Sequence, residues 1–416
     1  MSQVDDEVLG FCEENDVQFI KLAFCDAFGR QKNISIMSSE LPSALSNGVG
    51  FDASAVAGFG DVTDSDLFLF PDKASLCLLP WRPERGRVAR LFCDVRRTDG
   101  TPCESDPRAL LRAAAARAQR MDVRLSFGTE SEFYLFKTDE NGRPTDVPLD
   151  DAGYIDAAPA DAGENVRREI CLTLRQMGIA VERSHHEEGP GQNEIDFRFS
   201  DPMTCADNVV SFKAAVSSVA ARSGLYADFS PKPRPLDSGN GFHINISLDG
   251  DGASTAALRD SFMAGLLARV CELTAFLNPD DASYKRLGAH KAPRCVLWSR
   301  ANRSALIRVP GTTNGASRME LRSPDNLASP YLAFALLIHA GLDGIEQGLR
   351  APAAFEGNAF SATAQQLSGC ARLPESLPEA LGLMAKSDFV RRVVPQALIE
   401  CYLLRGGQDK QAKESN

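Results

Sequence analysis

Two acidic segments hold residue types suited to binding a divalent metal. Segment 184–197 reads Ser-His-His-Glu-Glu-Gly-Pro-Gly-Gln-Asn-Glu-Ile-Asp-Phe and carries two histidines and four carboxylates around a Gly-Pro-Gly turn. After the turn, Glu194 and Asp196 alternate with apolar residues, which predicts a half-buried strand with acid on one face. Upstream, Glu130 and Glu132 also lie two residues apart and point the same way. Carboxylates crowded on one sheet face repel each other unless a cation lies between them, so the pattern predicts a Mg²⁺ or Mn²⁺ site.

A third predicted strand, 242–248, follows the glycine-rich sequence Ser-Gly-Asn-Gly. Its alternation places His243, Asn245 and Ser247 on one face. A lone histidine in a strand is more often structural than catalytic. Here the glycine-rich entry and the polar residues at every second position favour a functional site.

Arginines are concentrated in a short part of this acidic chain, namely Arg303, Arg308, Arg318 and Arg322. Guanidinium groups suit phosphate and carboxylate ligands because they donate hydrogen bonds in a planar fork. A run of charge is usually a solvated face. Residues 318–322 alternate with apolar partners, however, so we interpret the group as an anion site.

The elements that must position these residues form an α+β protein with two predicted domains, 1–103 and 104–416. The boundary precedes a helix that begins at Asp106–Pro107, a favourable N-cap followed by proline in the first turn. The first domain should contain a hairpin over 17–37 and a loop over 48–60, where Asp52 stands among small residues. In the second domain, the sequence predicts helices over 164–177, 207–223, 256–277 and 330–349, with short helices beyond.

Composition excludes several classes of function. The chain has 416 residues and a net charge of −11, which argues against general nucleic-acid binding. Its N-terminal sequence has no signal-peptide pattern, and no apolar run is long enough to span a bilayer. The 11 scattered cysteines contain no Cys-x-x-Cys pair. This usage predicts reduced thiols and a cytoplasmic protein.

An acidic cage for two or three divalent cations beside arginines and glycine-rich loops suits phosphoryl transfer from a nucleotide. The sequence has no Gly-x-x-x-x-Gly-Lys-Ser/Thr loop and no dinucleotide fingerprint. It also lacks a Gly-x-Ser-x-Gly nucleophile elbow. The nucleotide site is therefore predicted to be neither a P-loop nor a Rossmann site.

Ordered blocks of this sequence resemble the glutamine synthetase family, in its bacterial and archaeal type I form, nearly from end to end. The blocks are 50–54, 128–133, 185–196, 231–233, 238–248, 278–287, 302–308 and 318–325. The resemblance implies a β-grasp-like N-terminal domain and a C-terminal catalytic domain around a curved antiparallel sheet. It also implies a homo-oligomer, with rings of six subunits that are usually stacked as dodecamers and active sites between neighbours.

The resemblance implies a role for each matching residue. For the metals, it implies Glu132, Glu187 and Glu194 at one ion and Glu130, His243 and Glu320 at the other. For ATP and its phosphates, it implies Arg303, Arg308 and Arg318, with Asn245 and Ser247 near the nucleotide. For the glutamate substrate, it implies Gly239, Arg286 and Arg322. Asp52, supplied by a neighbouring subunit, would take a proton from the incoming nitrogen.

Several positions depart from the family pattern. Lys291 stands where the family's flap has a glutamate that helps to bind ammonium, and the flap is one residue shorter. Asn245 replaces the second histidine of His-x-His, Ser238 replaces an asparagine, Ala55 replaces a serine, and Gly315 replaces a lysine. The ATP and metal residues are kept while the nitrogen pocket is altered.

We therefore expect an ATP-dependent ligase that joins the γ-carboxylate of glutamate, or a close analogue, to an amine other than ammonia. A lysine at the flap, here Lys291, would repel NH₄⁺. The alternatives are an ammonia-using glutamine synthetase, a non-catalytic relative kept for assembly or ligand binding, and a ligase for another acid whose extra carboxylate pairs with Lys291. The complete ligand set argues against the non-catalytic alternative.

Overall fold

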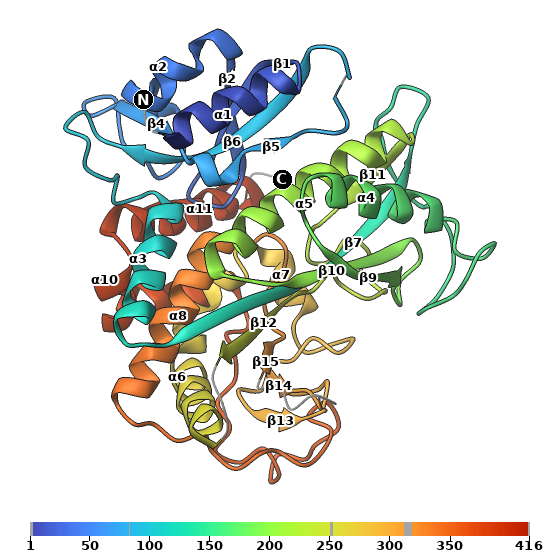
Figure 1. Cartoon of the computed structure of the whole chain (residues 1–416). Helices are drawn as coiled ribbons and strands as arrows, with labels where there is room; N and C mark the ends of the chain where they lie inside the picture. The colour runs from blue at the N-terminus through green and yellow to red at the C-terminus, as the bar shows by residue number, and fades with distance from the viewer. Residues whose placement is uncertain (1–2, 83, 250–252, 312–317, 415–416) are drawn as a thin grey trace.

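A computed structural model describes residues 3–82, 84–249, 253–311 and 318–414. Two sheets organise these residues, a six-stranded sheet in the N-terminal part and a nine-stranded sheet in the rest. Figure 1 shows the N-terminal part, in blue, lying over one end of the larger C-terminal part. Each part has its own apolar core. The fold is thus the mixed α and β arrangement that the sequence predicts.

The N-terminal sheet has the strand order β2-β1-β6-β4-β3, with β5 also paired to β6. Its strands are β1 (Val17–Cys25), β2 (Gln31–Met37), β3 (Val49–Asp52), β4 (Asp66–Pro71), β5 (Cys77–Leu78) and β6 (Arg87–Arg96). Helices of this part are α1 (Gln3–Glu14), α2 (Leu41–Asn47) and the short 3₁₀ turns η1 (Ser38–Glu40), η2 (Ala53–Ala55) and η3 (Lys73–Ser75).

The predicted hairpin is confirmed, because β1 and β2 pair in antiparallel fashion from Phe19–Met37 to Cys25–Gln31. The predicted loop over 48–60 is only partly correct. Its first residues form β3, which pairs with β4 through Val49–Leu69 and Phe51–Leu67. The glycines beside these two apolar residues hide the strand's alternation in the sequence.

The larger sheet has the order β13-β14-β15-β12-β7-β10-β9, and β8 and β11 also pair with β7. Its strands are β7 (Arg124–Thr138), β8 (Pro144–Pro148), β9 (Val181–His186), β10 (Gln192–Ser200), β11 (Leu225–Asp228), β12 (Phe242–Asp249), β13 (Trp298–Arg300), β14 (Ile307–Val309) and β15 (Arg318–Leu321). The pairing is antiparallel except between β13 and β14, which are parallel. The 15-residue strand β7 is the centre of this sheet.

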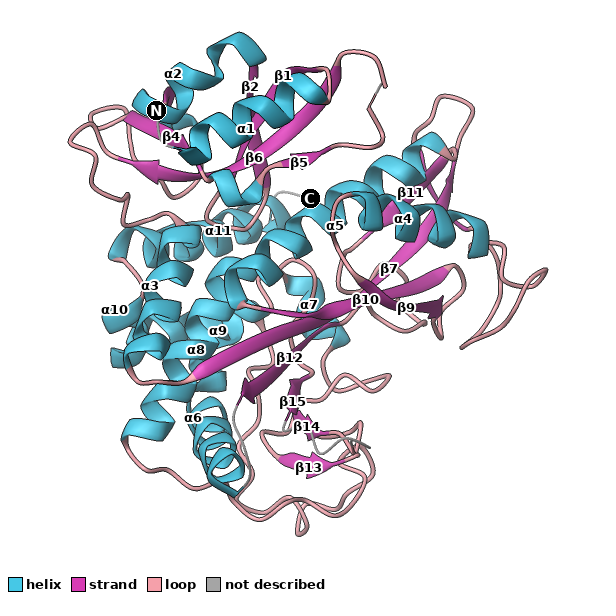
Figure 2. Ribbon diagram, viewed as in Figure 1, coloured by secondary structure: helices cyan, strands magenta, loops and turns pink. Residues whose placement is uncertain are grey.

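Most helices of this part lie to the left of the larger sheet and above it in Figure 2. The helices are α3 (Pro107–Arg120), α4 (Glu164–Gln176), α5 (Pro202–Arg222), α6 (Ala253–Leu277), α7 (Asp281–Arg286), α8 (Pro330–Glu346), α9 (Leu377–Lys386), α10 (Asp388–Val393) and α11 (Gln396–Glu414). The predicted N-cap is confirmed, since the Asp106 carboxylate accepts a hydrogen bond from the Arg108 backbone N–H. Helix α5 begins five residues before the predicted Asp207, because Asp201 caps it ahead of Pro202.

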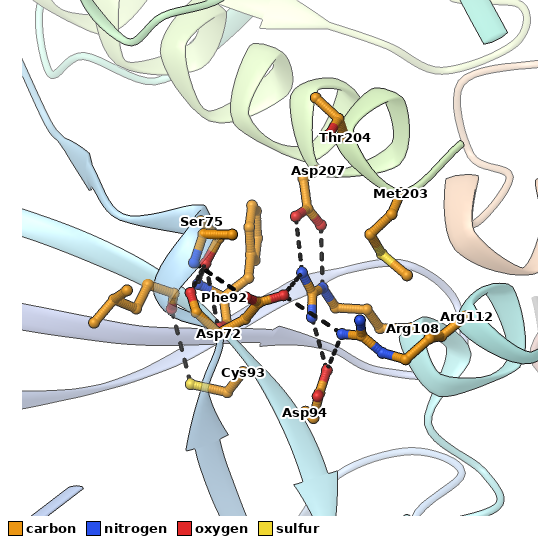
Figure 3. A network of polar contacts seen from close by, with 12 residues as sticks. Asp72, Ser75, Phe92, Cys93, Asp94, Arg108, Arg112, Met203, Thr204 and Asp207 are labelled. Atoms are coloured by element: carbon orange, nitrogen blue, oxygen red, sulfur yellow. Dashed lines mark hydrogen bonds and ion pairs between the residues drawn. The ribbon is translucent and has the colours of Figure 1, made fainter. Parts of the chain in front are cut away.

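One buried arginine joins the two parts of the chain (Figure 3). Arg108, on α3, donates to Asp72 and Asp94 of the N-terminal part, at 2.7 Å each. It also donates to both carboxylate oxygens of Asp207 on α5, at 3.2 and 3.0 Å. Arg112, one turn along α3 and half exposed, contacts the same two N-terminal carboxylates. The two parts therefore share a buried ion-pair network.

Candidate active site

The register of the larger sheet aligns the predicted metal ligands in one row across four strands. On β7, Glu132 lies opposite Glu194 of β10, and Glu130 lies opposite His243 of β12. On the other side of β12, Glu320 of β15 lies opposite Asn245. Because side chains in paired strands share a face, five strand positions from distant parts of the sequence converge.

The first ligand group consists of Glu130, His243 and Glu320, all buried, with ligand atoms within 4.8 Å of one another. The Nδ1 atom of His243 lies 3.3 Å from Glu130 Oε2 and 3.7 Å from Glu320 Oε1. These three residues are the ones that the family resemblance assigns to one metal.

The carboxylate of Glu194 joins the second set of ligand groups. A carboxylate oxygen of Glu194 forms one group with ligand atoms of Glu132 and His243, and a carboxylate oxygen of Glu194 also forms a second group with those of His185 and Glu187. The Nε2 atom of His185 lies 3.1 Å from Glu187 Oε1 and 3.8 Å from Glu194 Oε1. Of the three residues expected at the other metal, Glu194 therefore lies in one group with Glu132 and in a second group with Glu187. The second group also contains His185, which the sequence analysis gave no role.

A further group, Asp150, Asp161 and His186, supports the neighbouring turn. His186 contacts the Glu187 carbonyl at 2.7 Å and the Asp150 carboxylate at 2.9 Å. Asp161 forms an ion pair with Arg167. Both imidazole nitrogens are occupied by protein partners, so this group holds the turn that carries Glu187 in place.

Burial and neighbouring charges shift the pKa values of several carboxyl groups in the site. Burial and the charges of Asp196 and Glu132 raise the pKa of Glu194 well above its usual range. Burial, followed by the charge of Glu130, raises the pKa of Asp196 to about 6. Burial also raises the pKa of Glu132, although His243 opposes the shift. Burial would raise the pKa of Glu130 too, but its hydrogen bond to His243 and the charge of that residue lower it. This clustering is electrostatically costly without a cation.

The residues present fit a divalent metal. The donor set is rich in carboxylate oxygen with one or two imidazoles, which suits Mg²⁺ or Mn²⁺. In the described part of the chain, Asp196 Oδ1 and Asn245 Oδ1 are buried side-chain oxygens without a hydrogen-bond partner. A cation with its bound water would satisfy acceptors of this kind.

We expect the stabilisation of the protein by Mg²⁺ or Mn²⁺ to increase with pH between about 4 and about 6. The folded chain raises the pKa of Asp196 from 3.8 to about 6. Its contribution to the free energy of unfolding of the metal-free protein therefore falls as the pH rises through this window. Protons and metal compete for these oxygens. Thermal unfolding with metal and with EDTA at pH 4.5, 6 and 8 measures the difference, and a metal-induced shift that is equal at all three pH values would contradict the expectation.

Arginines surround the shared carboxylate of Glu320. Arg308 and Arg322 both form ion pairs with Glu320, one with each of its oxygens. Arg286 is buried and donates to the backbone carbonyls of Ser323, at 2.8 Å, and Arg322, at 3.3 Å. Arg308 and Arg322 of the predicted anion group therefore adjoin the predicted metal group.

A cavity of about 360 Å³ opens over this row of residues. The predicted site residues that line it are Glu130, Glu132, Glu187, Glu194, Gly239, His243, Arg286, Lys291, Arg303 and Arg322. Gly239 is required for its shape, because a Cβ atom there would lie 2.3 Å from the carbonyl oxygen of Pro231. The predicted residues that are not among the lining residues are Asp52, Asn245, Ser247, Arg308, Arg318 and Glu320.

Asp52 lies in the N-terminal part, where it is exposed at the end of β3. It caps η2 by accepting hydrogen bonds from the backbone N–H of Ser54 at 3.0 Å and from its hydroxyl at 2.6 Å. The single chain therefore does not bring Asp52 to its own cavity.

The departures from the family pattern have different surroundings. Asn245 donates to Glu130 at 3.2 Å, and Ser238 donates to Glu188 at 3.2 Å. Lys291 forms an ion pair with Glu188. Ala55 is exposed in η2, and Gly315 lies outside the described residues.

Besides His185, three residues without a role in the sequence analysis contact the site. Arg183 of β9 pairs with Asp196 and lies 3.5 Å from Glu130. Buried Gln192 donates to Glu132 at 3.3 Å. Alternation with His185 could have indicated Arg183. Asn326 lies in a turn between β15 and α8, where no periodic pattern indicates its role. Its amide donates to the backbone carbonyls of Glu132 and Gly241, at 2.9 Å each.

Asn326→Ala is expected to cost about 1–3 kcal/mol of unfolding free energy. The buried carbonyl of Glu132 loses its amide donor, and that of Gly241 keeps only the Glu132 N–H. It should also weaken metal binding, since one carbonyl belongs to Glu132 itself and the other to the residue before β12, which carries His243. Urea unfolding and Mn²⁺ titration measure the two effects. The control is Asn141→Ala in an exposed turn, and equal results for both variants would contradict the prediction.

Comparison with known proteins gives a consistent assignment. The profile of the glutamine synthetase catalytic domain matches residues 104–411, and that of the glutamine synthetase β-grasp domain matches residues 16–98. The glutamine synthetase of Clostridium saccharobutylicum is 44% identical over 402 residues, covering 94% of this chain and 91% of that protein. That of Methanosarcina mazei is 42% identical over 411 residues, covering 96% and 92%. A solved structure of a GmaS/ADP complex has a TM-score of 0.88 at 28% identity, covering 98% of this chain and 96% of the other.

These matches define an enzyme of the ligase class. The chain belongs to the glutamine synthetase family. Membership implies the use of ATP and a divalent metal. None of the described helices is long and apolar enough to cross a membrane.

Proposed function

We propose that the protein uses ATP to activate the γ-carboxylate of glutamate as an acyl phosphate and then joins it to ammonia. The observation that supports this most directly is the shared carboxylate of Glu320. It groups with the metal-binding atoms of Glu130 and His243 and also pairs with Arg308 and Arg322. Transfer of a phosphoryl group to an acid needs this combination of cation and guanidinium.

In this proposal each residue keeps the role implied by the family. The site would hold two or three Mg²⁺ or Mn²⁺ ions, which would supply positive charge to the phosphates. Glu130, His243 and Glu320 would hold one ion, and Glu132, Glu187 and Glu194 another. The arginines would bind the phosphates, with Arg303, Arg308 and Arg318 in this role, and Asn245 and Ser247 would lie near the nucleotide. Gly239, Arg286 and Arg322 would hold glutamate.

Ammonia is placed before other amines for two reasons. The relatives that share 44% and 42% identity are named glutamine synthetase. In addition, Lys291 pairs with Glu188, so its charge is offset at the cavity. Lys291 therefore repels NH₄⁺ less than the sequence suggests. This repulsion was the reason to prefer another amine.

A larger amine remains the second candidate because of the cavity rim. Tyr154 and Ile155 line the cavity and are 48% and 65% exposed, so they offer apolar surface to an alkyl group. ATP hydrolysis and amide formation with glutamate are to be compared for ammonium, methylammonium, ethylammonium and larger amines. Best turnover with an alkylamine would reverse the order of the two candidates.

Two further measurements could end the proposal, namely turnover with other acids and calorimetry with Mg-ATP. Turnover with an acid other than glutamate would show a different substrate, with Lys291 available for an extra carboxylate. Failure to bind Mg-ATP in calorimetry would indicate a non-catalytic assembly or binding protein. Neither nucleic acid nor a membrane has a place in the proposed function, and the proposed location is the cytoplasm.

We further propose a homo-oligomer, a hexameric ring or a dodecamer, in which Asp52 completes the site of a neighbour. Asp52 is exposed and remote from its own cavity, which supports this arrangement. Mixing two inactive variants, Asp52→Asn and Glu194→Gln, should restore part of the activity after subunit exchange, because some sites would then receive two intact halves. Mixtures that stay inactive although both variants form mixed rings would contradict a shared site.

A further inference from the structure

We propose that Glu188 and Tyr154 form the binding site for the protonated nitrogen donor, and that the ammonium group of Lys291 occupies this site as a tethered competitor. The inference rests on the proposed function and adds the recognition of the donor to it. It concerns binding before the chemical step.

The position of the Lys291 ammonium group carries the inference. Its Nζ atom pairs with the Glu188 carboxylate and lies 5.7 Å from the centre of the Tyr154 ring. All three residues line the cavity that contains the metal ligands. A carboxylate beside the face of an aromatic ring is the environment that proteins use to bind ammonium and alkylammonium ions. A lysine side chain is itself a primary alkylammonium ion, so the structure holds a representative of the expected ligand.

The two groups of this site are held by other parts of the chain. Glu188 accepts a second hydrogen bond from the hydroxyl of Ser238, at 3.2 Å. The Tyr154 ring packs edge-on against His185, with ring centres 5.4 Å apart, and the next backbone N–H donates to the His186 carbonyl at 2.9 Å. The carboxylate and the ring would therefore remain in place when Lys291 leaves.

Lys291 is suited to leave. Its side chain is 51% exposed and that of Glu188 is 32% exposed, and ion pairs this exposed are weak. Lys291 and the preceding His290 both have a left-handed backbone, with φ of 64° and 44°, which non-glycine residues adopt at a cost. A free cation at high concentration can displace a weakly held side chain.

Removal of the competitor should improve binding of the donor. In Lys291→Met, we expect the KM for ammonium and methylammonium to fall by about two- to fivefold, the strength of an exposed ion pair. In Glu188→Gln, the KM for the donor should rise by about tenfold or more, because a charge-assisted contact is lost. The double variant should behave like Glu188→Gln, since the competitor matters only when its partner is present.

Two further variants separate this role from a structural one. Tyr154→Leu should raise the KM for methylammonium more than that for ammonium, because the ring contacts the alkyl group. Lys285→Met, an exposed lysine on α7, is the control for loss of positive charge and should change neither KM. The KM values for glutamate and ATP, and the Mg²⁺ dependence, should stay the same in all variants.

Three results would overturn the inference. One is an unchanged donor KM in Glu188→Gln in an active enzyme. Another is a rise in the KM for glutamate instead, which would assign the carboxylate to the amino group of the acid substrate. The third is a changed Mg²⁺ dependence, which would mean that Glu188 acts through Glu187. If the wild-type protein forms no amide with any donor, the proposed function fails. Calorimetry with methylammonium chloride then tests the site alone, with binding expected in Lys291→Met and not in the double variant.

Discussion

Glu194→Gln is expected to abolish metal-dependent activity while raising the thermal stability of the metal-free protein. Glu194 is buried on β10 and faces Glu132, with Asp196 and Glu187 close by. Its nearest cationic candidate is His185, at 3.8 Å. A neutral amide of the same size removes a buried carboxylate whose pKa is raised by burial and by like charges, so the metal-free fold loses a repulsion.

The same change removes an oxygen ligand. Mutation of groups around a metal typically costs on the order of 10- to 100-fold in affinity or activity, and loss of a direct ligand should cost at least as much. Turnover at saturating Mg²⁺ and thermal unfolding in EDTA measure the two effects. The control is Glu182→Gln, an exposed glutamate on β9. Full activity in the variant would show that Glu194 is not a metal ligand. Lower stability than the wild type in EDTA would show that Glu194 is not repelled by the neighbouring carboxylates in the metal-free protein.

Arg108→Ala should destabilise the whole chain by about 3–5 kcal/mol, because a buried guanidinium is removed from three partly buried carboxylates. Of these, Asp72 and Asp94 keep the exposed Arg112 as a cationic partner. The Arg108 side chain is 4% exposed and bonds to Asp72, Asp94 and Asp207. Asp207 also accepts a hydrogen bond from the hydroxyl of Tyr331 at 2.6 Å, so the disturbance would reach α8.

Arg112→Ala offers a matched control for this variant. Arg112 contacts the same Asp72 and Asp94, but its side chain is 50% exposed, and we expect a loss of only about 0–1 kcal/mol. Urea unfolding followed by circular dichroism compares the two. Equal losses in the two variants would contradict the view that Arg108 is the central link between the two parts.

Period-two patterns predicted much of the catalytic sheet. Glu130 and Glu132 on one face, and Glu194 and Asp196 on another strand, follow from alternation alone. The pairing of these strands does not follow from alternation, because register depends on turn geometry and packing partners. The family resemblance implied an antiparallel sheet and two ligand groups, and the order β12-β7-β10 places His243, Glu130, Glu132 and Glu194 on neighbouring strands.

Other features had no local signal. The pair of Glu188 and Lys291 joins residues 103 positions apart. The sequence therefore suggested an uncompensated lysine where the structure has an ion pair. Helix α5 starts earlier than predicted because its capping Asp201 precedes a proline that resembles a loop signal. Strand β3 was missed because glycine and small residues conceal its apolar alternation.

The buried guanidinium of Arg108 has a consequence for mechanics. Because it bonds to carboxylates of both parts, the smaller lobe cannot swing freely on the short connection between residues 98 and 104. The exposed end of β3, which carries Asp52, is then held in a fixed orientation relative to the larger part. If such subunits formed a ring, the orientation of the two parts within each subunit would help to set its curvature. If the chain were cut at this connection, the two fragments could associate again only by removing water from the Arg108 guanidinium.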